Sequence, residues 1–208
     1  KIEGKGWSGV VSAPFNNNEY STGHPALSQD GKTLYFVSDM PGGKGGSDIY
    51  MVAINSDGSL GTPERLGDNI NTEGKELFPY IDSNGTLYFS SNGHMGIGGL
   101  DVFYAEAQGD GFDVVNNLGK GVNSSADDFA YKYDPTSQSG YVSSNREGGM
   151  GSDDIYMVEA VEIPCEVTIA VLVINENTNA AVAGARVDLY DTMGNRLSTK
   201  TSNVDGMV

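Results

Sequence analysis

The chain has few residues of the kinds that build catalytic centres, disulfides and membrane spans. Its 208 residues include one cysteine, Cys165, and two histidines, His24 and His94. A single cysteine excludes an intrachain disulfide, and it is compatible with either the cytoplasm or the periplasm. The two histidines are far apart in sequence, which favours structural roles over a shared metal site. No apolar run reaches the roughly 18 residues that indicate a membrane-spanning helix.

Basic residues are also scarce. Twelve Lys and Arg stand against 28 Asp and Glu, which gives a formal net charge of −16 and a pI near 4.2. Such a surface repels the phosphates of nucleic acids and the headgroups of anionic membranes. We therefore expect no nucleic-acid partner and no membrane span. The acidity itself indicates solubility, with calcium binding as the alternative.

Both ends of the sequence suggest a longer polypeptide. The first twenty residues lack the apolar core of a signal peptide, and the first residue is Lys1 instead of an initiator methionine. The last residue, Val208, falls within a strand-like pattern. What lies before Lys1 and after Val208 is a question that the sequence leaves open.

Glycine, by contrast, is abundant at 29 residues, and much of it belongs to a repeat of 53 residues. The segment Leu34-Tyr35-Phe36-Val37-Ser38 returns as Leu87-Tyr88-Phe89-Ser90-Ser91 and again as Tyr141-Val142-Ser143-Ser144. Asp48-Ile49-Tyr50 returns as Asp101-Val102-Phe103 and as Asp154-Ile155-Tyr156. Several matches at one constant offset are the signature of a repeat architecture.

In the second strand of the first repeat, Leu34, Phe36 and Ser38 alternate with Tyr35 and Val37, so both faces carry apolar residues, as in a sheet covered on both sides, and no segment has helical periodicity. We expect four strands in each repeat. The first strands are predicted at 24–28, 78–82 and 129–133, and the second strands at 33–38, 86–91 and 140–144. The third strands begin at Asp48, Asp101 and Asp154, and the weaker fourth strands cover 62–67 and 112–119. Residues 6–15 are predicted to be a lone outer strand from a preceding unit.

The connections within a repeat are turns and glycine-rich loops. Asp30-Gly31 and Asn84-Gly85 predict two-residue hairpins, because these pairs favour positive φ at both central positions. Residues 135–139 predict a longer turn in the third repeat. The glycine-rich loops follow the second strands, at 41–46, 93–99 and 147–151.

Four antiparallel strands in about 50 residues are typical of one β-propeller blade. We predict an all-β protein in which residues 1–162 form about three blades plus the leading strand, an incomplete propeller because closed propellers need about four to eight blades. The predicted blades cover 23–75, 76–127 and 128–160. The total blade number and the oligomeric state are not determined by the sequence.

The repeat ends near residue 160, and a second β-domain is predicted over 163–208. Its signals are a β-branched run at 167–174, a second strand at 183–190 and the turns Met193-Gly194-Asn195 and Asp205-Gly206. This order resembles the N-terminal part of a carboxypeptidase-regulatory-like β-sandwich. About 45 residues give only part of such a sandwich, and isolated hairpins are marginally stable.

The repeat itself resembles a known propeller family. Pro25-Ala26-Leu27-Ser28-Gln29-Asp30-Gly31, Leu34-Tyr35-Phe36 and Gly45-Gly46-Ser47-Asp48-Ile49-Tyr50 are similar to the TolB-type, WD-repeat-like propeller repeat. The linking motif Leu66-Gly67, Ile70-Asn71-Thr72, Glu76 and Pro79 resembles propellers of Bacteroidota envelope proteins.

Three aspartates recur at one position of each repeat: Asp48, Asp101 and Asp154. The favoured interpretation is structural, with each carboxylate holding the backbone of its glycine-rich loop. Calcium is the alternative, and Asp153 with Asp154 is then the candidate ligand pair. No other cofactor or metal is expected.

The sequence points to a binding surface and away from catalysis. Adjacent carboxylates such as Asp127-Asp128 point to opposite faces of a strand, and no nucleophile motif occurs, so we expect no enzyme. The glycine-rich loops and the segments between blades are expected to share one face. The candidate binding residues on that face are Tyr20, Asn71, Met95, Asn123, Arg146 and Met150.

A propeller followed by a regulatory-like domain resembles the OmpA-family envelope proteins of Bacteroidota, among them the peptidoglycan-associated accessory protein of the type IX secretion system. The resemblance implies a periplasmic scaffold associated with the outer membrane, which binds other envelope proteins. It would reach peptidoglycan only through a domain absent from this chain. The alternative is a carbohydrate-binding propeller module. Partners, glycans and calcium remain undetermined at this level.

Overall fold

The computed structural model describes residues 9–161 and 169–208, so Trp7 and Cys165 lie outside the described residues. The chain is all-β, and the described residues contain no helix, hence none that could cross a bilayer. It divides into two compact units, Lys1–Ala160 and Val161–Val208. Each unit is described by itself.

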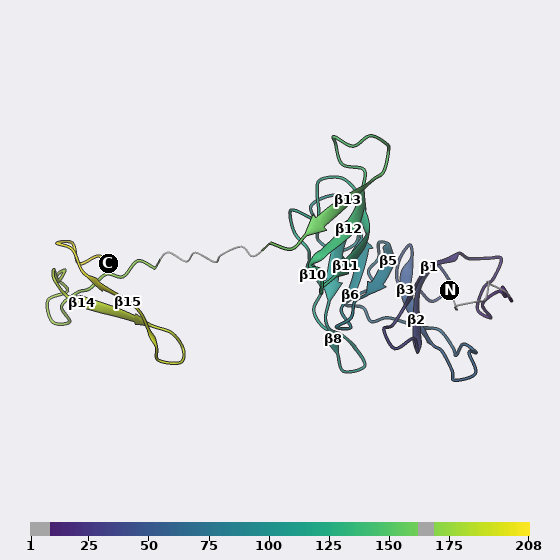
Figure 1. The fold of residues 1–208 in the computed structure, drawn as a ribbon, viewed down its shortest axis with the longest axis horizontal. Coiled ribbons are helices and arrows are strands. Elements are labelled where there is room, and N and C mark those ends of the chain that lie inside the picture. Colours follow the sequence, from purple (N-terminus) through teal and green to yellow (C-terminus); the bar gives the residue numbers. More distant parts are fainter. Residues whose placement is uncertain (1–8, 162–168) are drawn as a thin grey trace. The chain divides into compact units, whose positions relative to one another are not determined.

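The first unit contains three successive antiparallel sheets, none of them closed (Figure 1). Sheet 1 has the order β1 (Thr22–Leu27), β2 (Thr33–Ser38), β3 (Asp48–Ala53) and β4 (Glu64–Arg65). Sheet 2 consists of β5 (Glu76–Ile81), β6 (Leu87–Ser91), β7 (Asp101–Ala105) and β10 (Asn116–Asn117). Sheet 3 consists of β11 (Asp128–Asp134), β12 (Ser139–Ser144) and β13 (Asp154–Glu159). A small hairpin, β8 (Ala107–Gln108) and β9 (Gly111–Phe112), extends from sheet 2.

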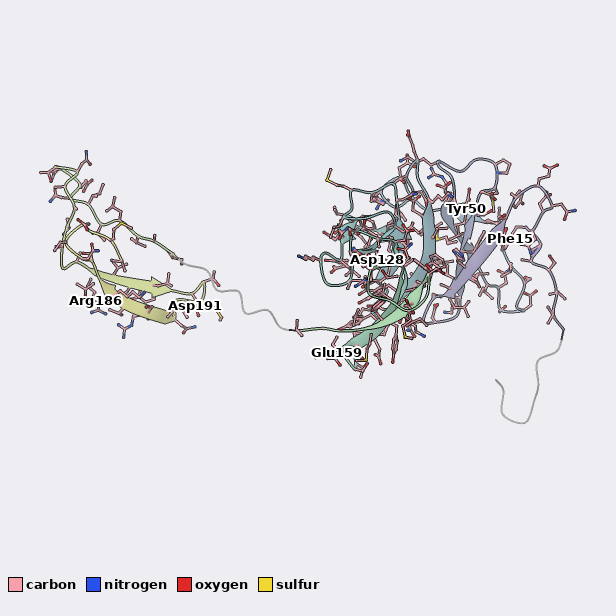
Figure 2. All side chains as sticks on the ribbon, turned by 90° about the horizontal axis from the view of Figure 1, so that it is seen from above. Phe15, Tyr50, Asp128, Glu159, Arg186 and Asp191 are labelled. Carbon is pink, nitrogen blue, oxygen red and sulfur yellow. The ribbon has the colours of Figure 1, made fainter. Side chains whose placement is uncertain are left out.

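The strand order follows the repeat, but the outer strands differ from the prediction. The fourth strands β4 and β10 are two residues long, and sheet 3 has no fourth strand among the described residues. The predicted lone strand at 6–15 is wrong over its described part, since residues 9–15 form no strand. Phe15 instead stacks its ring on Phe36 at 4.5 Å, so this segment contributes an apolar side chain and no ladder hydrogen bonds (Figure 2 labels Phe15).

The hairpin turns are longer than predicted. In sheet 1 the backbone N–H of Ser28 donates to Thr33 O, which leaves four residues in the turn. In sheet 2 Asp82 N donates to Thr86 O, which leaves three residues. Gly31 and Gly85 have positive φ, whereas Asp30 and Asn84 do not. A two-residue hairpin turn needs positive φ at both central residues. Only the glycine of each pair has positive φ, so the longer turns form.

A β-bulge interrupts the first strand of every sheet at the same position. The register shifts between Gly23 and Ala26, between Leu77 and Tyr80, and between Phe129 and Lys132. The residue after the first of each pair lies in the left-handed region: His24 (φ 49°), Phe78 (φ 52°) and Ala130 (φ 54°). Bulges bend a strand and increase its twist, so all three first strands are bent alike.

Apolar side chains fill the seams between neighbouring sheets. One cluster joins sheets 1 and 2 and includes the fully buried Ile49, Leu87 and Phe89. A second cluster joins sheets 2 and 3 and includes Val102, Tyr131 and Val142. Burial in this seam raises the pKa of Tyr131 to about 12, so its phenol stays neutral at physiological pH.

The second unit is a small antiparallel arrangement around β14 (Arg186–Tyr190) and β15 (Arg196–Thr201). The predicted strand at 167–174 is reduced, in its described part, to single bridges at Leu172 and Ile174. Many of its apolar side chains are exposed; Leu172 and Leu197, for example, expose more than half of their surface. Two paired strands bury little apolar surface by themselves, which agrees with this exposure.

Candidate binding face

The glycine-rich loops and the segments between sheets meet along one edge of the first unit. The backbone N–H of Gly46, in the first loop, donates to Gly74 O in the segment that joins sheets 1 and 2 (2.6 Å). Gly99 N, in the second loop, donates to Ala126 O in the segment that joins sheets 2 and 3 (3.1 Å). The first two glycine-rich loops thus lie against the segments that lead to the next sheet; that all loops and connections share one face stays a prediction.

Each loop is folded around the carboxylate of the aspartate that begins the third strand. Asp48 Oδ2 accepts the backbone N–H groups of Lys44 (2.8 Å) and Gly45 (3.2 Å). Asp101 and Asp154 do the same for the residues four and three positions before them, at 2.8–2.9 Å. We call this arrangement the carboxylate bracket. It is the loop-holding role that the favoured interpretation assigns to these aspartates.

The glycines of the loops are required by this bracket. A Cβ atom at Gly96 would overlap Asp101 Oδ2, and one at Gly149 would overlap Asp154 Oδ2. A Cβ atom at Gly98 would likewise overlap the backbone oxygens of Ala126 and Ser124. The loops are therefore glycine-rich because carboxylate and backbone oxygens approach them closely.

A second repeated anchor was not predicted from the sequence. Asp39, Asn92 and Asn145 each follow a second strand, 53 residues apart. Their Oδ1 atoms accept the backbone N–H groups of Ser21 (2.6 Å), Lys75 (2.8 Å) and Asp127 (2.8 Å), at the entrance to the first strands. The signal in the sequence was the constant spacing of an Asx residue after the repeated serine.

The assignment of two residues to the binding face is wrong. Asn71 is fully buried and Asn123 is 2% exposed. Their amides bind the backbone of Ile49 and Val102, each the second residue of its third strand, and are not available to a partner. A primary amide matches a peptide unit with one donor and one acceptor, which explains why asparagine occupies both positions.

Arg146 also has a structural role. Its guanidinium forms a charge-assisted hydrogen bond with the fully buried carboxylate of Asp128, which Figure 2 labels, and a second bond with Val122 O at 2.6 Å. The guanidinium lies over the ring of Tyr156, 4.8 Å from its centroid. Asp128 also accepts the backbone N–H and the hydroxyl of Ser124. The corresponding buried carboxylate of sheet 2, Glu76, accepts the same two groups from Thr72, and the hydroxyl of Ser91 takes the place of the guanidinium.

Two of the predicted face residues are fully available and one is partly available. Met95 is 94% exposed, and Met150 is exposed to the same extent as in an extended chain. Tyr20 is half-buried, and its hydroxyl donates to Phe15 O at 2.6 Å. The part of the predicted face that remains consists of the glycine-rich loops and the exposed side chains of Met95 and Met150, and we call it the loop face.

The titratable side chains of the described residues are dispersed over the first unit or used in structural contacts. No group of three or more His, Cys, Asp or Glu residues that could hold a metal occurs in the described ranges. Asp154 uses Oδ2 for its bracket, while Asp153 is exposed. His24 and His94 lie apart: His24 Nδ1 accepts Phe78 N–H at 3.2 Å, and His94 Nε2 bonds to Ile70 O at 2.8 Å. Burial lowers the pKa of His24.

The three sheets are also joined by rings on their first strands. His24 stacks on Phe78 with 4.0 Å between the ring centroids, and Phe78 stacks on Phe129 at 5.3 Å. Together with the His24 hydrogen bond, these rings connect the bulges of successive sheets.

Comparison with known proteins adds no family. No protein-family model matches the chain, and no curated protein matches it.

Proposed function

We propose that the first unit is part of a β-propeller, with blades over residues 23–75, 76–127 and 128–160. Support comes from the repetition of one strand order and from contacts between the first strands, β1 with β5 and β5 with β11. The bulges at one shared position of these strands give further support. First strands that contact one another in sequence order are what blades arranged around an axis require.

We propose that this unit is a non-enzymatic scaffold that binds other proteins through its loop face. The observation that carries the proposal is the carboxylate bracket, which uses the recurrent acidic groups to hold loops in place. The most exposed large apolar side chains of the bracketed loops are Met95 and Met150. Methionine is flexible and polarisable, which suits contacts with protein surfaces.

The wider setting is proposed from the order of the two units. A propeller followed by the N-terminal part of a carboxypeptidase-regulatory-like domain fits a periplasmic, outer-membrane-associated envelope protein of Bacteroidota, of the kind that serves type IX secretion. Peptidoglycan would be bound through an OmpA-like domain outside this chain. The alternative of a carbohydrate-binding module is less favoured, because Asn71 and Asn123 are buried and removed from its polar surface.

Site-specific crosslinking tests the scaffold proposal. A photoreactive residue is placed at Met95 or at Met150 in the protein as the source cell makes it. The matched control is Asp57, an exposed residue in the turn at the opposite end of β3. We expect discrete crosslinked partner proteins from the two methionine positions and few from Asp57. Equal crosslinking at all three positions, or none at the methionines, would contradict the loop face as the binding surface.

A further inference from the structure

In sheet 1 the outer edge of β3 pairs with the short strand β4. Residues 66–71, with the sequence Leu-Gly-Asp-Asn-Ile-Asn, continue from β4 and cover this edge at Ile49. Leu66 N donates to Ile49 O at 3.0 Å. Asn71 Oδ1 accepts Ile49 N–H at 2.7 Å, and Asn71 Nδ2 donates to Ile49 O at 3.0 Å. Both peptide groups of one edge residue are therefore bound by a single short segment.

Sheet 2 repeats this arrangement with residues 118–123, Leu-Gly-Lys-Gly-Val-Asn. Leu118 N donates to Val102 O at 3.1 Å. Asn123 Oδ1 accepts Val102 N–H at 2.8 Å, and its Nδ2 donates to Val102 O at 2.9 Å. The same three hydrogen bonds are formed at the equivalent residue.

Apolar contacts accompany these hydrogen bonds. Ile49 is fully buried in one cluster with Leu66 and Ile70. Val102 is fully buried in one cluster that also includes Leu118 and Val122. A strand edge of this repeat thus binds the pattern Leu-Gly-x-x-(Ile or Val)-Asn through backbone, amide and aliphatic groups together.

In sheet 3 the equivalent residue is Ile155, which pairs with Ser143 as Ile49 pairs with Val37 and Val102 with Ser90. Its side chain is 76% exposed. No described residue forms a hydrogen bond with its backbone N–H or C=O from outside the sheet. Ala160 N bonds to Gln138 O on the β12 side, so by alternation the peptide groups of Ile155 face outward. Figure 2 shows Glu159 at the end of this strand.

We propose that the outer edge of β13 at Ile155 binds a segment of the sequence Leu-Gly-x-x-(Ile or Val)-Asn from a partner polypeptide, folded into a turn as both copies in this chain are. The chain contains this pattern twice, and both copies are already bound to sheets 1 and 2. The inference gives the scaffold a partner class. It uses only the hydrogen bonds above, so it holds or fails separately from the loop face.

A synthetic peptide with the sequence of residues 114–124 tests the proposal against the complete 208-residue chain. NMR titration of the ¹⁵N-labelled chain is expected to shift the amide signals of Ile155 and its neighbours in β13. A matched peptide with Asn123→Ala is expected to bind about ten-fold more weakly or less, since both amide hydrogen bonds to Ile155 are lost. Equal binding by the two peptides would overturn the proposed recognition.

The chain itself offers a second pair of variants. Ile155→Pro removes the outward N–H without breaking a bond to β12, as proline is tolerated at strand edges. We expect it to abolish binding, whereas Ile155→Val binds within about three-fold of the original. If Ile155→Pro does not fold, the peptide pair still decides.

Two further results would overturn the inference. One is the absence of any shift at about 1 mM peptide, an affinity too weak to matter. The other is slow hydrogen exchange of the Ile155 amide in the free chain, equal to that of Ile49 and Val102, because it would mean that the edge is already covered.

Discussion

The buried amide of Asn71 is the most stringent test of how the sheets are held together. Asn71→Ala removes one acceptor and two donors from a fully buried position. Ile49 O keeps its bond from Leu66 N, so two groups lose their side-chain partner, Ile49 N–H and Leu66 O. A buried polar group without a partner costs about 1–3 kcal/mol, so the two groups together give a loss of about 2–6 kcal/mol in the free energy of unfolding.

For a unit of this size, in which about 1 kcal/mol shifts the Tm by 2–4 °C, the loss corresponds to a fall in Tm of roughly 4–24 °C. Calorimetry of the complete chain measures it, with the first unit identified by its larger transition enthalpy. The matched control is Asn84→Ala, since Asn84 is exposed and its side chain forms no hydrogen bond within the described part of the chain. If Asn71→Ala lowers the Tm no more than Asn84→Ala does, the amide does not stabilise the edge and the reasoning is wrong.

Three other measurements address the remaining contacts. The pKa of His24 is below 6.5 in the folded chain, so the unfolded chain takes up a proton first as the pH falls. The free energy of unfolding should therefore decrease from pH 6.5 down to the folded pKa. His24→Asn should lack this decrease when urea unfolding is measured at pH 7.5 and at pH 5.0. Arg146→Met leaves the carboxylate of Asp128 buried without its cation, and we expect a loss of about 3 kcal/mol in urea unfolding; a loss below about 1 kcal/mol would show that water replaces the guanidinium. Gly98→Ala places a methyl group against backbone oxygens and should cost at least about 2 kcal/mol, whereas Gly111→Ala enters open space and should be nearly neutral; similar stabilities for the two would refute the close approach.

The sequence predicts the strands of the repeat well, because alternation and a constant offset are local signals. The second strand predicted at 33–38 coincides with β2, and Asp48, Asp101 and Asp154 begin the third strands as expected. The side-chain partners were less predictable. Asn71 binds a backbone group 22 residues earlier, and a polar residue in a connecting segment carries no local sign of burial.

Some errors have a different origin. The bulges at His24 and Phe78 lie in strands whose residue pattern gives no sign of them, and the two residues contact each other only across neighbouring sheets. For residues 9–15 a strand was predicted from Val10 and Val11, both of which are exposed. Apolar residues form a strand only where a partner edge is available, and here no described edge receives them.

The carboxylate bracket separates the path of the main chain from the identity of the side chain at one loop position. The residue four places before the aspartate donates its N–H in all three loops, yet it is Lys44 in the first, Ile97 in the second and Met150 in the third. A cation, a branched hydrocarbon and a thioether are thus carried by the same backbone geometry. Substitutions at this position can therefore change which partner surfaces the loop binds, while the sheets beneath it keep their structure.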